Sequence, residues 1–257
     1  MKVITVANSK GGVGKTTTTT AMASTLESFG YKVLLIDADP QCNSTDTYQG
    51  LVINHHTLAD VLAPDKNRCK IIDAIQHTPY GDLLAGDGLL ERSDVILPSA
   101  SDRFRLKNAI DELRKENIYD FVIIDTNNIF NALLESCLFA TDDVIIPIEA
   151  GRYAMKGLNS FIKKIVDIKM NINHDIEIAG ILLIKYAARE TLSKDAVEYL
   201  HEVAEQLQIK FFDTKIRKSA DQGKAQKKQM CIIHYAPKST TSQDYVEFVK
   251  EYLKGKE

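Results

Sequence analysis

Residues 10–17 read K-G-G-V-G-K-T-T, and the apolar run at 3–7 before them is typical of a β-strand. The three glycines let the backbone curl so that successive N–H groups face one point, which favours an anion. Lys15 adds a cation, Thr16 adds a hydroxyl ligand for Mg²⁺, and the helix expected after the loop adds its positive N-terminal end. This pattern predicts a phosphate-binding loop for a nucleoside triphosphate. The residues expected to contact it are Lys10, Gly11, Gly12, Val13, Gly14, Lys15, Thr16 and Thr17.

The loop departs from the common pattern G-x-x-x-x-G-K-[ST] at its start. Ser9 occupies the first glycine position, and Lys10 follows it directly. Lys10 lies five residues before Lys15 and is less well placed than Lys15 to reach phosphates bound by its own loop. We therefore expect Lys10 to reach a nucleotide held by a second copy of the chain, and the alternative is a solvated loop lysine.

Two further apolar runs end in acidic residues. Residues 33–36 lead into Asp37 and Asp39, and residues 121–124 lead into Asp125. Such runs are typical of buried parallel strands, whose carboxyl ends border the ligand crevice of an open sheet. A single Asp after a strand is often only a helix cap or turn former. Three of them beside a phosphate loop favour a Mg²⁺ site, with Thr16, Asp37 and Asp125 as the metal-binding candidates.

These motifs resemble the ParA/MinD family of deviant-Walker ATPases, and more closely its ParA/Soj branch, which partitions plasmids and chromosomes. The resemblance spans nearly the whole chain and implies an ATPase that uses ATP and Mg²⁺. Its other carriers are D-A-D-P-Q-C-N at 37–43, R-F-R-L-K at 103–107, I-I-D-T at 123–126, I-P-I-E at 146–149, A-M-K-G-L at 154–158 and Y-A-P-K-S at 235–239.

The resemblance also implies roles for individual residues. Lys15 and Mg²⁺ would hold the triphosphate, Asp39 would orient the attacking water, and Lys10 would complete the site of a partner subunit. The catalytic candidates are thus Lys10, Lys15 and Asp39. ATP would then hold a homodimer together, and hydrolysis would dissolve it.

One position departs from the family. After the aspartate of the second apolar run the family usually reads D-x-P-P, whereas this chain has Asp125-Thr126-Asn127-Asn128. Proline stiffens a loop by fixing φ, and asparagine does not. Either this loop is looser here, or the two asparagines make polar contacts of their own.

A cluster of cations lies near the C-terminus of a chain whose formal net charge is −3. Such a cluster can neutralise phosphates without reading bases, and the alternative is a solvated basic loop. Its members, against the single acid Asp221, are Lys215, Arg217, Lys218, Lys224, Lys227 and Lys228.

The resemblance favours nonspecific duplex DNA as the partner of this cluster in the ATP-bound dimer, together with a ParB-like centromere-binding protein. It adds Arg189 and Lys194 to the DNA-binding candidates, whereas Asp221 and Lys224 depart from the residues usual in the family. The resemblance also implies that the segment 216–219 contacts the nucleotide base. The residues expected to do so are Ile216, Arg217 and Ser219.

Strands alternating with helices predict an α/β fold with a single doubly wound, mostly parallel sheet and helices on both faces, as in P-loop NTPases. We expect strands at 2–7, 32–37, 82–85, 120–125, 143–148, 178–184 and 209–212. We expect helices at 15–29, 57–63, 102–116, 131–139, 154–170, 191–207 and 241–254. Residues 1–257 are expected to form one ATPase domain, without an N-terminal helix-turn-helix domain.

Cysteine spacing and the lengths of apolar runs indicate the cellular compartment. The four cysteines are widely separated, which argues against a zinc knuckle or a disulfide framework. We expect no signal peptide, because one short strand leads directly into the loop, and no apolar run is long enough to span a membrane. We therefore expect a cytoplasmic, nucleoid-associated protein that does not bind membranes.

Three other functional classes of P-loop protein are alternatives to a partition ATPase. A MinD-like positioning ATPase needs a membrane-binding C-terminal helix, but the mixed charges of residues 245–254 indicate a packed one. An iron-sulfur electron carrier of the nitrogenase type needs paired cysteines. A small-molecule amidoligase of the dethiobiotin-synthetase type remains the main enzyme alternative, because it uses the same fold and loop.

Overall fold

Seven strands form one sheet among the residues that the structure, a computed structural model, describes: 1–64, 66, 68–150 and 152–255. Their order is β3-β4-β2-β5-β1-β6-β7, and all neighbours are parallel except β3 and β4. The strands are β1 (Lys2–Val6), β2 (Val33–Ala38), β3 (Ile75–Thr78), β4 (Gly81–Leu84), β5 (Phe121–Thr126), β6 (Asp143–Glu149) and β7 (Glu177–Ile184). This is the doubly wound α/β architecture that the sequence predicts.

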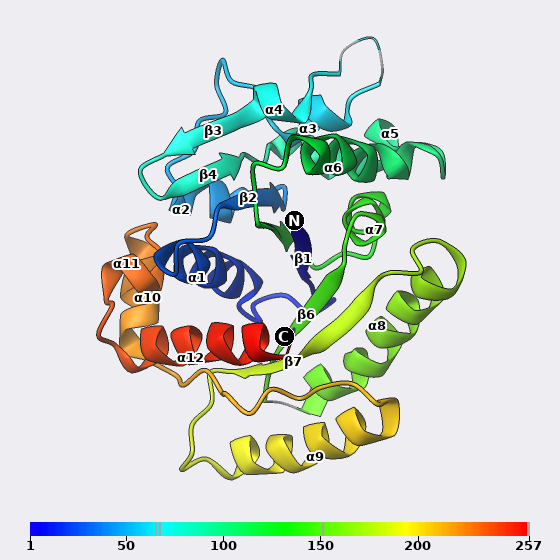
Figure 1. Cartoon of the computed structure of the whole chain (residues 1–257). Helices are drawn as coiled ribbons and strands as arrows, with labels where there is room; N and C mark the ends of the chain where they lie inside the picture. The colour runs from blue at the N-terminus through cyan, green and yellow to red at the C-terminus, as the bar shows by residue number, and fades with distance from the viewer. Residues whose placement is uncertain (65, 67, 151, 256–257) are drawn as a thin grey trace.

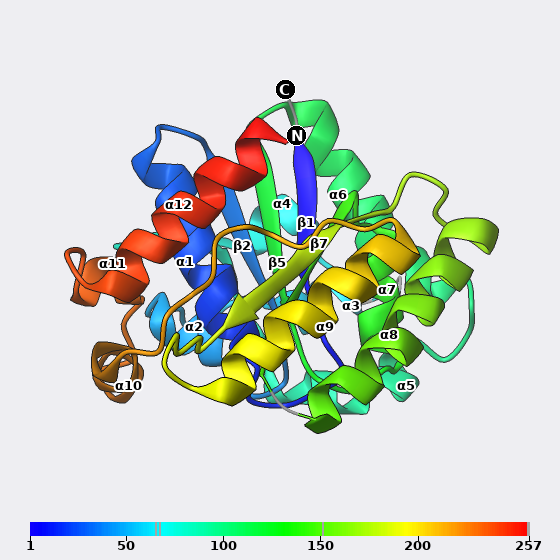
Figure 2. The ribbon, with the colours of Figure 1, turned by 90° about the horizontal axis from the view of Figure 1, so that it is seen from below.

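Helices cover both faces of the sheet (Figures 1 and 2). The α-helices are α1 (Lys15–Ser28), α2 (Asn43–Thr47), α3 (Leu58–Leu62), α4 (Ile71–Ala74), α5 (Ser93–Ile96), α6 (Arg105–Glu116), α7 (Ala132–Phe139), α8 (Arg152–Asn171), α9 (Thr191–Leu207), α10 (Ala220–Lys227), α11 (Ile232–Tyr235) and α12 (Thr240–Lys254). The 3₁₀-helical turns are η1 (Gly88–Arg92) and η2 (Asp102–Phe104). The side chains of 152–156 are not described, so the motif at 154–158 lies partly outside the described residues.

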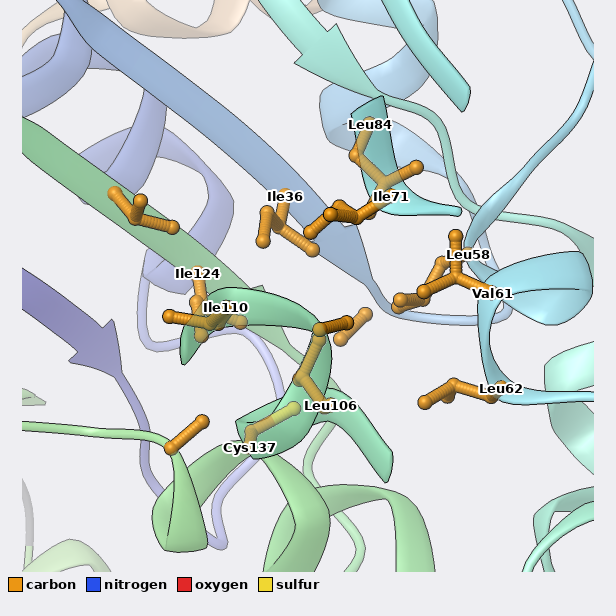
Figure 3. Close-up of a cluster of buried hydrophobic side chains, with 14 of the residues drawn as sticks. Ile36, Leu58, Val61, Leu62, Ile71, Leu84, Leu106, Ile110, Ile124 and Cys137 are labelled. Atoms are coloured by element: carbon orange, nitrogen blue, oxygen red, sulfur yellow. The ribbon is translucent and has the colours of Figure 1, made fainter. Parts of the chain in front are cut away.

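Alternation along the strands divides the core into layers. Leu34 and Ile36 of β2 pack with α3, α4, α6 and α7, whereas Leu35 faces α1 and α12 on the other side. Figure 3 shows the first layer, in which Ile36 and Ile124 of neighbouring strands meet Ile110 of α6. Both faces of the central strands are therefore buried, which explains their continuous apolar sequences.

The expected strand at 209–212 is wrong, because only a single bridge joins Phe211 to Ile181. The helix expected at 102–116 begins with the separate turn η2 before α6. The structure also adds elements that the apolar patterns did not indicate: β3, α2, α4, α5, α10 and α11. No helix in the described part of the chain is long and apolar enough to cross a membrane.

A half-buried carboxyl lies at the edge of the sheet opposite the phosphate loop. Glu27 of α1 packs against Gly81, where φ is 122° and an added Cβ would lie 2.0 Å from Glu27 Oε1. Burial and the nearby Asp82 raise the pKa of Glu27 to about 8. The Asp82 carboxylate itself accepts a hydrogen bond of 2.7 Å from the Tyr119 hydroxyl. Glu27 is thus protonated in the folded protein at a pH where an exposed glutamate is ionised.

We expect this carboxyl to destabilise the fold as the pH rises. A raised folded-state pKa means that the folded state binds more protons than the unfolded state between about 4.5 and 8, so its contribution to stability falls across that window. Glu27→Gln should therefore gain stability relative to wild type as the pH increases from 5 to 8, measured by urea unfolding. Glu247→Gln, at an exposed position of α12, is the control, and a pH-independent difference for Glu27→Gln would contradict the prediction.

Candidate active site

A cleft of about 900 Å³ opens at the carboxyl edge of the sheet. The phosphate loop forms one wall through Gly11, Gly12 and Gly14. The ends of β6 and β7, the segment 216–219 and helices α10 and α12 form the others. The carboxyl edge of the parallel strands is the place where this fold binds ligands.

The backbone of the loop has the conformation that its glycines predict. Gly12 and Gly14 have φ of 73° and 68°, and a Cβ on Gly14 would lie 2.7 Å from Ile184 Cδ1. Gly14 is also the N-cap of α1 and supplies no side-chain cap, and no acidic residue occupies the first turn. The first N–H groups of α1 therefore remain available to an anion.

Lys15 lies in the floor of this cleft with only 8 % of its surface exposed. Burial lowers its pKa, while Asp125 and Asp39 oppose that shift. Its ammonium donates a long hydrogen bond of 3.4 Å to the Lys10 carbonyl. A phosphate beside Lys15 would supply the negative charge that best stabilises the buried ammonium.

Two fully buried carboxylates lie beneath the loop. Asp125 accepts hydrogen bonds from Ser44 Oγ at 2.8 Å and Thr19 Oγ1 at 3.4 Å, and the Thr16 hydroxyl also contacts it. Burial raises its pKa to about 6, against the effect of the Thr16 and Ser44 hydroxyls. Asp125 thus connects the first turns of α1 and α2 to the end of β5.

Asp37 is the second of these buried carboxylates, and the resemblance implies that it meets Mg²⁺ mainly through the water ligands of the metal. It is fully buried and does not line the cleft. One carboxylate oxygen accepts from the Asp39 N–H at 3.1 Å, and the other accepts from the Thr45 N–H at 2.7 Å and the Thr45 hydroxyl at 2.8 Å. Asp37 therefore positions the segment from Asp39 to Thr45, and its burial leaves room for the expected contact with Mg²⁺ through water.

Thr16 and Asp125 together fit Mg²⁺. Thr16 lines the cleft and its hydroxyl touches Asp125, so a hydroxyl and a carboxylate lie together beside the phosphate loop. Oxygen ligands are those that Mg²⁺ prefers, commonly one or two from protein with water and phosphate completing the shell. A bound Mg²⁺ would neutralise charge on the phosphates and favour the ionised form of Asp125.

Asp39 lines the cleft, as its expected role requires. Its carboxylate oxygen Oδ1 accepts from the Gln41 N–H at 3.0 Å, and this bond fixes the side chain above Asp37. A carboxylate held at the edge of a phosphate site can accept a hydrogen bond from water and orient it toward phosphorus.

The two asparagines stand where the family usually has prolines, and they lie differently in the structure. Asn127 is 6 % exposed, and its Oδ1 accepts from the Ile129 N–H at 3.1 Å, which closes a turn through a side chain. Asn128 lines the cleft beside Gly11, where an added Cβ would lie 3.3 Å from Asn128 Nδ2. Of the two expectations for this loop, the structure shows a polar contact for Asn127, and it places Asn128 in the wall of the cleft.

Not every residue of the predicted loop faces the cleft. Val13 is fully buried, and neither Val13 nor Lys10 lines the cleft of its own chain. The Lys10 N–H donates to Asn8 Oδ1 at 2.9 Å, so the backbone there is fixed. This placement agrees with a Lys10 side chain that serves a site other than its own.

The segment 216–219 lines the opposite wall. Ile216, Arg217 and Ser219 all border the cleft. Ser219 is the N-cap of α10, and its hydroxyl accepts from the Asp221 N–H at 3.1 Å. The expected base-contacting residues are thus brought to the cleft, at the wall across from the phosphate loop.

The basic cluster does not form one solvated loop. Arg217 donates to Asp244 of α12, with Nη2 and Oδ1 2.6 Å apart, and Lys224 pairs with Asp221 at 3.0 Å. Lys215 lies over the Phe211 ring, 5.3 Å from its centroid. The other DNA-binding candidates are exposed side chains, Lys218, Lys227 and Lys228 beside or on α10, and Arg189 and Lys194 before and within α9.

Three glutamines of α10 and the turn after it, spaced at 222, 226 and 229, were not among the predicted site residues. Gln222 Nε2 and Gln226 Nε2 lie 3.2 and 3.5 Å from Thr17 Oγ1 of the phosphate loop. Gln229 Nε2 donates to Asp46 Oδ2 of α2 at 3.0 Å. This spacing places the three amides on one stripe of the helix, which we call the glutamine stripe. It connects the basic helix directly to the phosphate loop.

Fold and loop together define a P-loop ATPase of the deviant-Walker type, and comparisons with known proteins identify the family. The family model AAA_31, described as an AAA domain, matches residues 1–178. The sporulation initiation inhibitor protein Soj of Bacillus subtilis is 31% identical, over 97% of this chain and 97% of its own. The chromosome partitioning protein ParA of Caulobacter vibrioides is 31% identical, over 98% and 94%. The chain belongs to the ParA/MinD family, on its ParA/Soj branch.

A solved structure agrees with the fold. Cobyrinic acid a,c-diamide synthase from Mycobacterium smegmatis, solved with bound ADP and magnesium, superposes with a TM-score of 0.82 at 28% identity, covering 99% of this chain and 94% of the other. As a member of this family the chain is an ATPase, and ATP and Mg²⁺ are its nucleotide and metal. The separate roles of its residues rest on the geometry above.

Asp39 and Lys15 should be separable by mutation. Asp39→Ala removes the group that orients water but leaves the phosphate contacts, so it should retain ATP affinity and lose most turnover. Lys15→Ala removes the buried cation and should lose ATP binding itself. Calorimetric titration with ATP and a phosphate-release assay measure the two effects. Comparable turnover by Asp39→Ala and wild type would refute the role of Asp39.

Proposed function

We propose that this protein is an ATP-dependent dimerisation switch that partitions DNA. The observation that carries the proposal is Lys10, which belongs to an otherwise complete phosphate loop yet does not line its own cleft. A lysine from each subunit that reaches the nucleotide of the other makes ATP part of the interface, so hydrolysis removes the attraction that holds the dimer. Residues 1–257 would act as one ATPase domain.

Nonspecific duplex DNA is the partner that the basic helix favours. Lys224, Lys227 and Lys228 are exposed on α10 or directly after it, while the glutamine stripe of the same segment contacts the cleft. A short helix with cations and no apolar outer face suits phosphate contacts that do not read bases. Two such helices in a dimer would bind more tightly than one.

The names of the relatives support the remaining parts of the proposal. The Caulobacter protein is a chromosome partitioning protein, and the resemblance to this branch implies a ParB-like DNA-binding partner. The protein would then act in the cytoplasm, on the nucleoid or on a plasmid.

Dimerisation should depend on Lys10. With a slowly hydrolysed ATP analogue, wild type should change from monomer to dimer in light scattering, because each subunit supplies a cation to the triphosphate of the other. Lys10→Ala should stay monomeric and still bind the nucleotide through Lys15. A Lys10→Ala protein that dimerises normally would contradict the proposed contact in trans.

DNA binding should be salt-sensitive and independent of sequence. If each subunit neutralises two or three phosphates, the slope of log K against log salt should be roughly −4 to −5 with ATP, and binding should be much weaker with ADP. Replacing Lys224, Lys227 and Lys228 by alanine should flatten the slope and weaken binding equally on unrelated duplexes, measured by mobility shift at several salt concentrations.

A matched triple variant controls for the change in net charge. Lys115, Lys163 and Lys254 are exposed on α6, α8 and α12, and their replacement by alanine removes the same charge elsewhere. Equal losses in the two triple variants would show that α10 is not the DNA surface.

The similarity to cobyrinic acid a,c-diamide synthase favours one second candidate, an ATP-dependent amide-forming enzyme. Such an enzyme consumes ATP only with its small-molecule acid and ignores DNA. Stimulation of ATP hydrolysis by duplex DNA in the absence of any small acid would therefore exclude it, and wild type that binds no DNA with ATP would favour it.

A further inference from the structure

Lys185 follows the last residue of β7 and has a left-handed backbone. Its φ is 53°. This conformation brings the Cβ of a residue other than glycine close to the following carbonyl oxygen and is therefore strained. Strained residues of this kind are concentrated at ligand sites, where their surroundings hold them. Lys185 is one of seven described residues other than glycine with such a φ, and its side-chain contacts show what lies beside it.

Its ammonium reaches the phosphate loop. Lys185 Nζ donates to the Gly12 carbonyl at 3.0 Å and to Glu149 Oε2 at 2.8 Å. Glu149 ends β6, the strand next to β7, and pairs with Ile184 in the register of the sheet. Lys185, Glu149 and Gly12 all line the cleft, so the ammonium lies at the edge of the ligand space and not on a remote surface.

One N–H donor of the Lys185 ammonium is left for a ligand. An ammonium group carries three N–H donors. Among the described residues, Gly12 and Glu149 are the acceptors it reaches, so the third N–H can point into the cleft. The side chain is 46% exposed, so a ligand can approach without displacing protein atoms.

The charges that line the cleft indicate what the third N–H of Lys185 could bind. Lys15 is the cation in the floor, and Arg217 on the opposite wall is engaged by Asp244. A triphosphate distributes negative charge over all of its phosphates, and a second cation beside the loop would share it. Lys185 lies against the carbonyl of Gly12, within the loop that curls around those phosphates.

We propose that Lys185 is a further phosphate-binding cation of the ATP site, held in place by Glu149. Nucleotide binding adds a phosphate oxygen as the third acceptor of its ammonium. Sequence reasoning could have found it, because the end of β7 reaches the same edge as Asp37 and Asp125. The proposal concerns ATP binding alone and stands or falls separately from DNA partition.

A simpler role for Lys185 predicts a different result. Lys185 could only neutralise Glu149, whose carboxylate would otherwise repel a triphosphate. Both roles predict that Lys185→Met binds ATP more weakly. They separate in the double variant Lys185→Met/Glu149→Gln, which removes the carboxylate together with the lysine. Neutralisation alone predicts that the double variant recovers wild-type affinity.

The experiment is calorimetric titration with a slowly hydrolysed ATP analogue and Mg²⁺. A charge-assisted hydrogen bond at a half-exposed site contributes about tenfold in affinity, so Lys185→Met should bind roughly tenfold more weakly. The double variant should remain roughly tenfold weak, and Lys185→Arg, which keeps the charge, should recover most of the loss. Recovery of wild-type affinity by the double variant would overturn the proposal.

Two further measurements test the contact. AMP lacks the outer phosphates, so its affinity should change much less than that of ATP, and an equal loss for both would place the contact elsewhere. The pair of Lys169 and Glu177 joins α8 to the far end of β7 and serves as the matched control. Lys169→Met and its double variant with Glu177→Gln should leave the affinity for the ATP analogue unchanged, whereas a similar tenfold loss there would show a general charge effect and overturn the assignment.

Discussion

The pair of buried carboxylates at the ends of β2 and β5 is the constraint on which the site depends. Asp37 and Asp125 are register partners in the sheet, and neither is exposed to solvent. Each carboxylate is costly to bury, and the charge of Asp125 raises the pKa of Asp37 further. Hydroxyls and N–H groups from outside the sheet offset this cost: Thr16, Thr19, Ser44 and Thr45.

Those contacts fix the elements that surround the nucleotide. Thr16 and Thr19 belong to α1, so Asp125 holds the helix that begins at the phosphate loop. Ser44 and Thr45 belong to α2, so the two carboxylates also hold the segment that carries Asp39. The same set of hydrogen bonds therefore fixes the positions of the phosphate loop, the candidate metal-binding hydroxyl of Thr16 and the candidate water-orienting carboxylate of Asp39.

Much of this arrangement could be predicted from local sequence, because long apolar runs and glycine positions are local signals. The central strands and the loop belong to that class. The edge strand β3 does not, since Ile75–Thr78 is short and mostly polar and gains its order from pairing with β4. Helix α10 has a single buried side chain, Ala225, so its sequence has no apolar period to detect.

At the site, too, the sequence missed what depends on contacts between distant parts of the chain. Because strand ends carry ligands, the sequence indicated Asp37 and Asp125 as site residues. It did not indicate how deeply each carboxylate is buried. The contacts of Asp37 with Thr45, which enclose its carboxylate, are formed only in the fold. Counting cations between 215 and 228 overstated their free charge, because the partner of Arg217 is Asp244, 27 residues further along the chain. Contacts of that range cannot be read from spacing.

If α10 is the DNA surface proposed above, the glutamine stripe places the segment 220–229 between the ATP cleft and the DNA. Its amides contact Thr17 and Asp46, while its lysines face outward. Thermodynamic linkage is reciprocal, so any factor by which ATP raises the affinity for DNA is the factor by which DNA raises the affinity for ATP. A segment placed between the two would then let DNA-bound subunits retain ATP at concentrations too low to keep free subunits loaded with it.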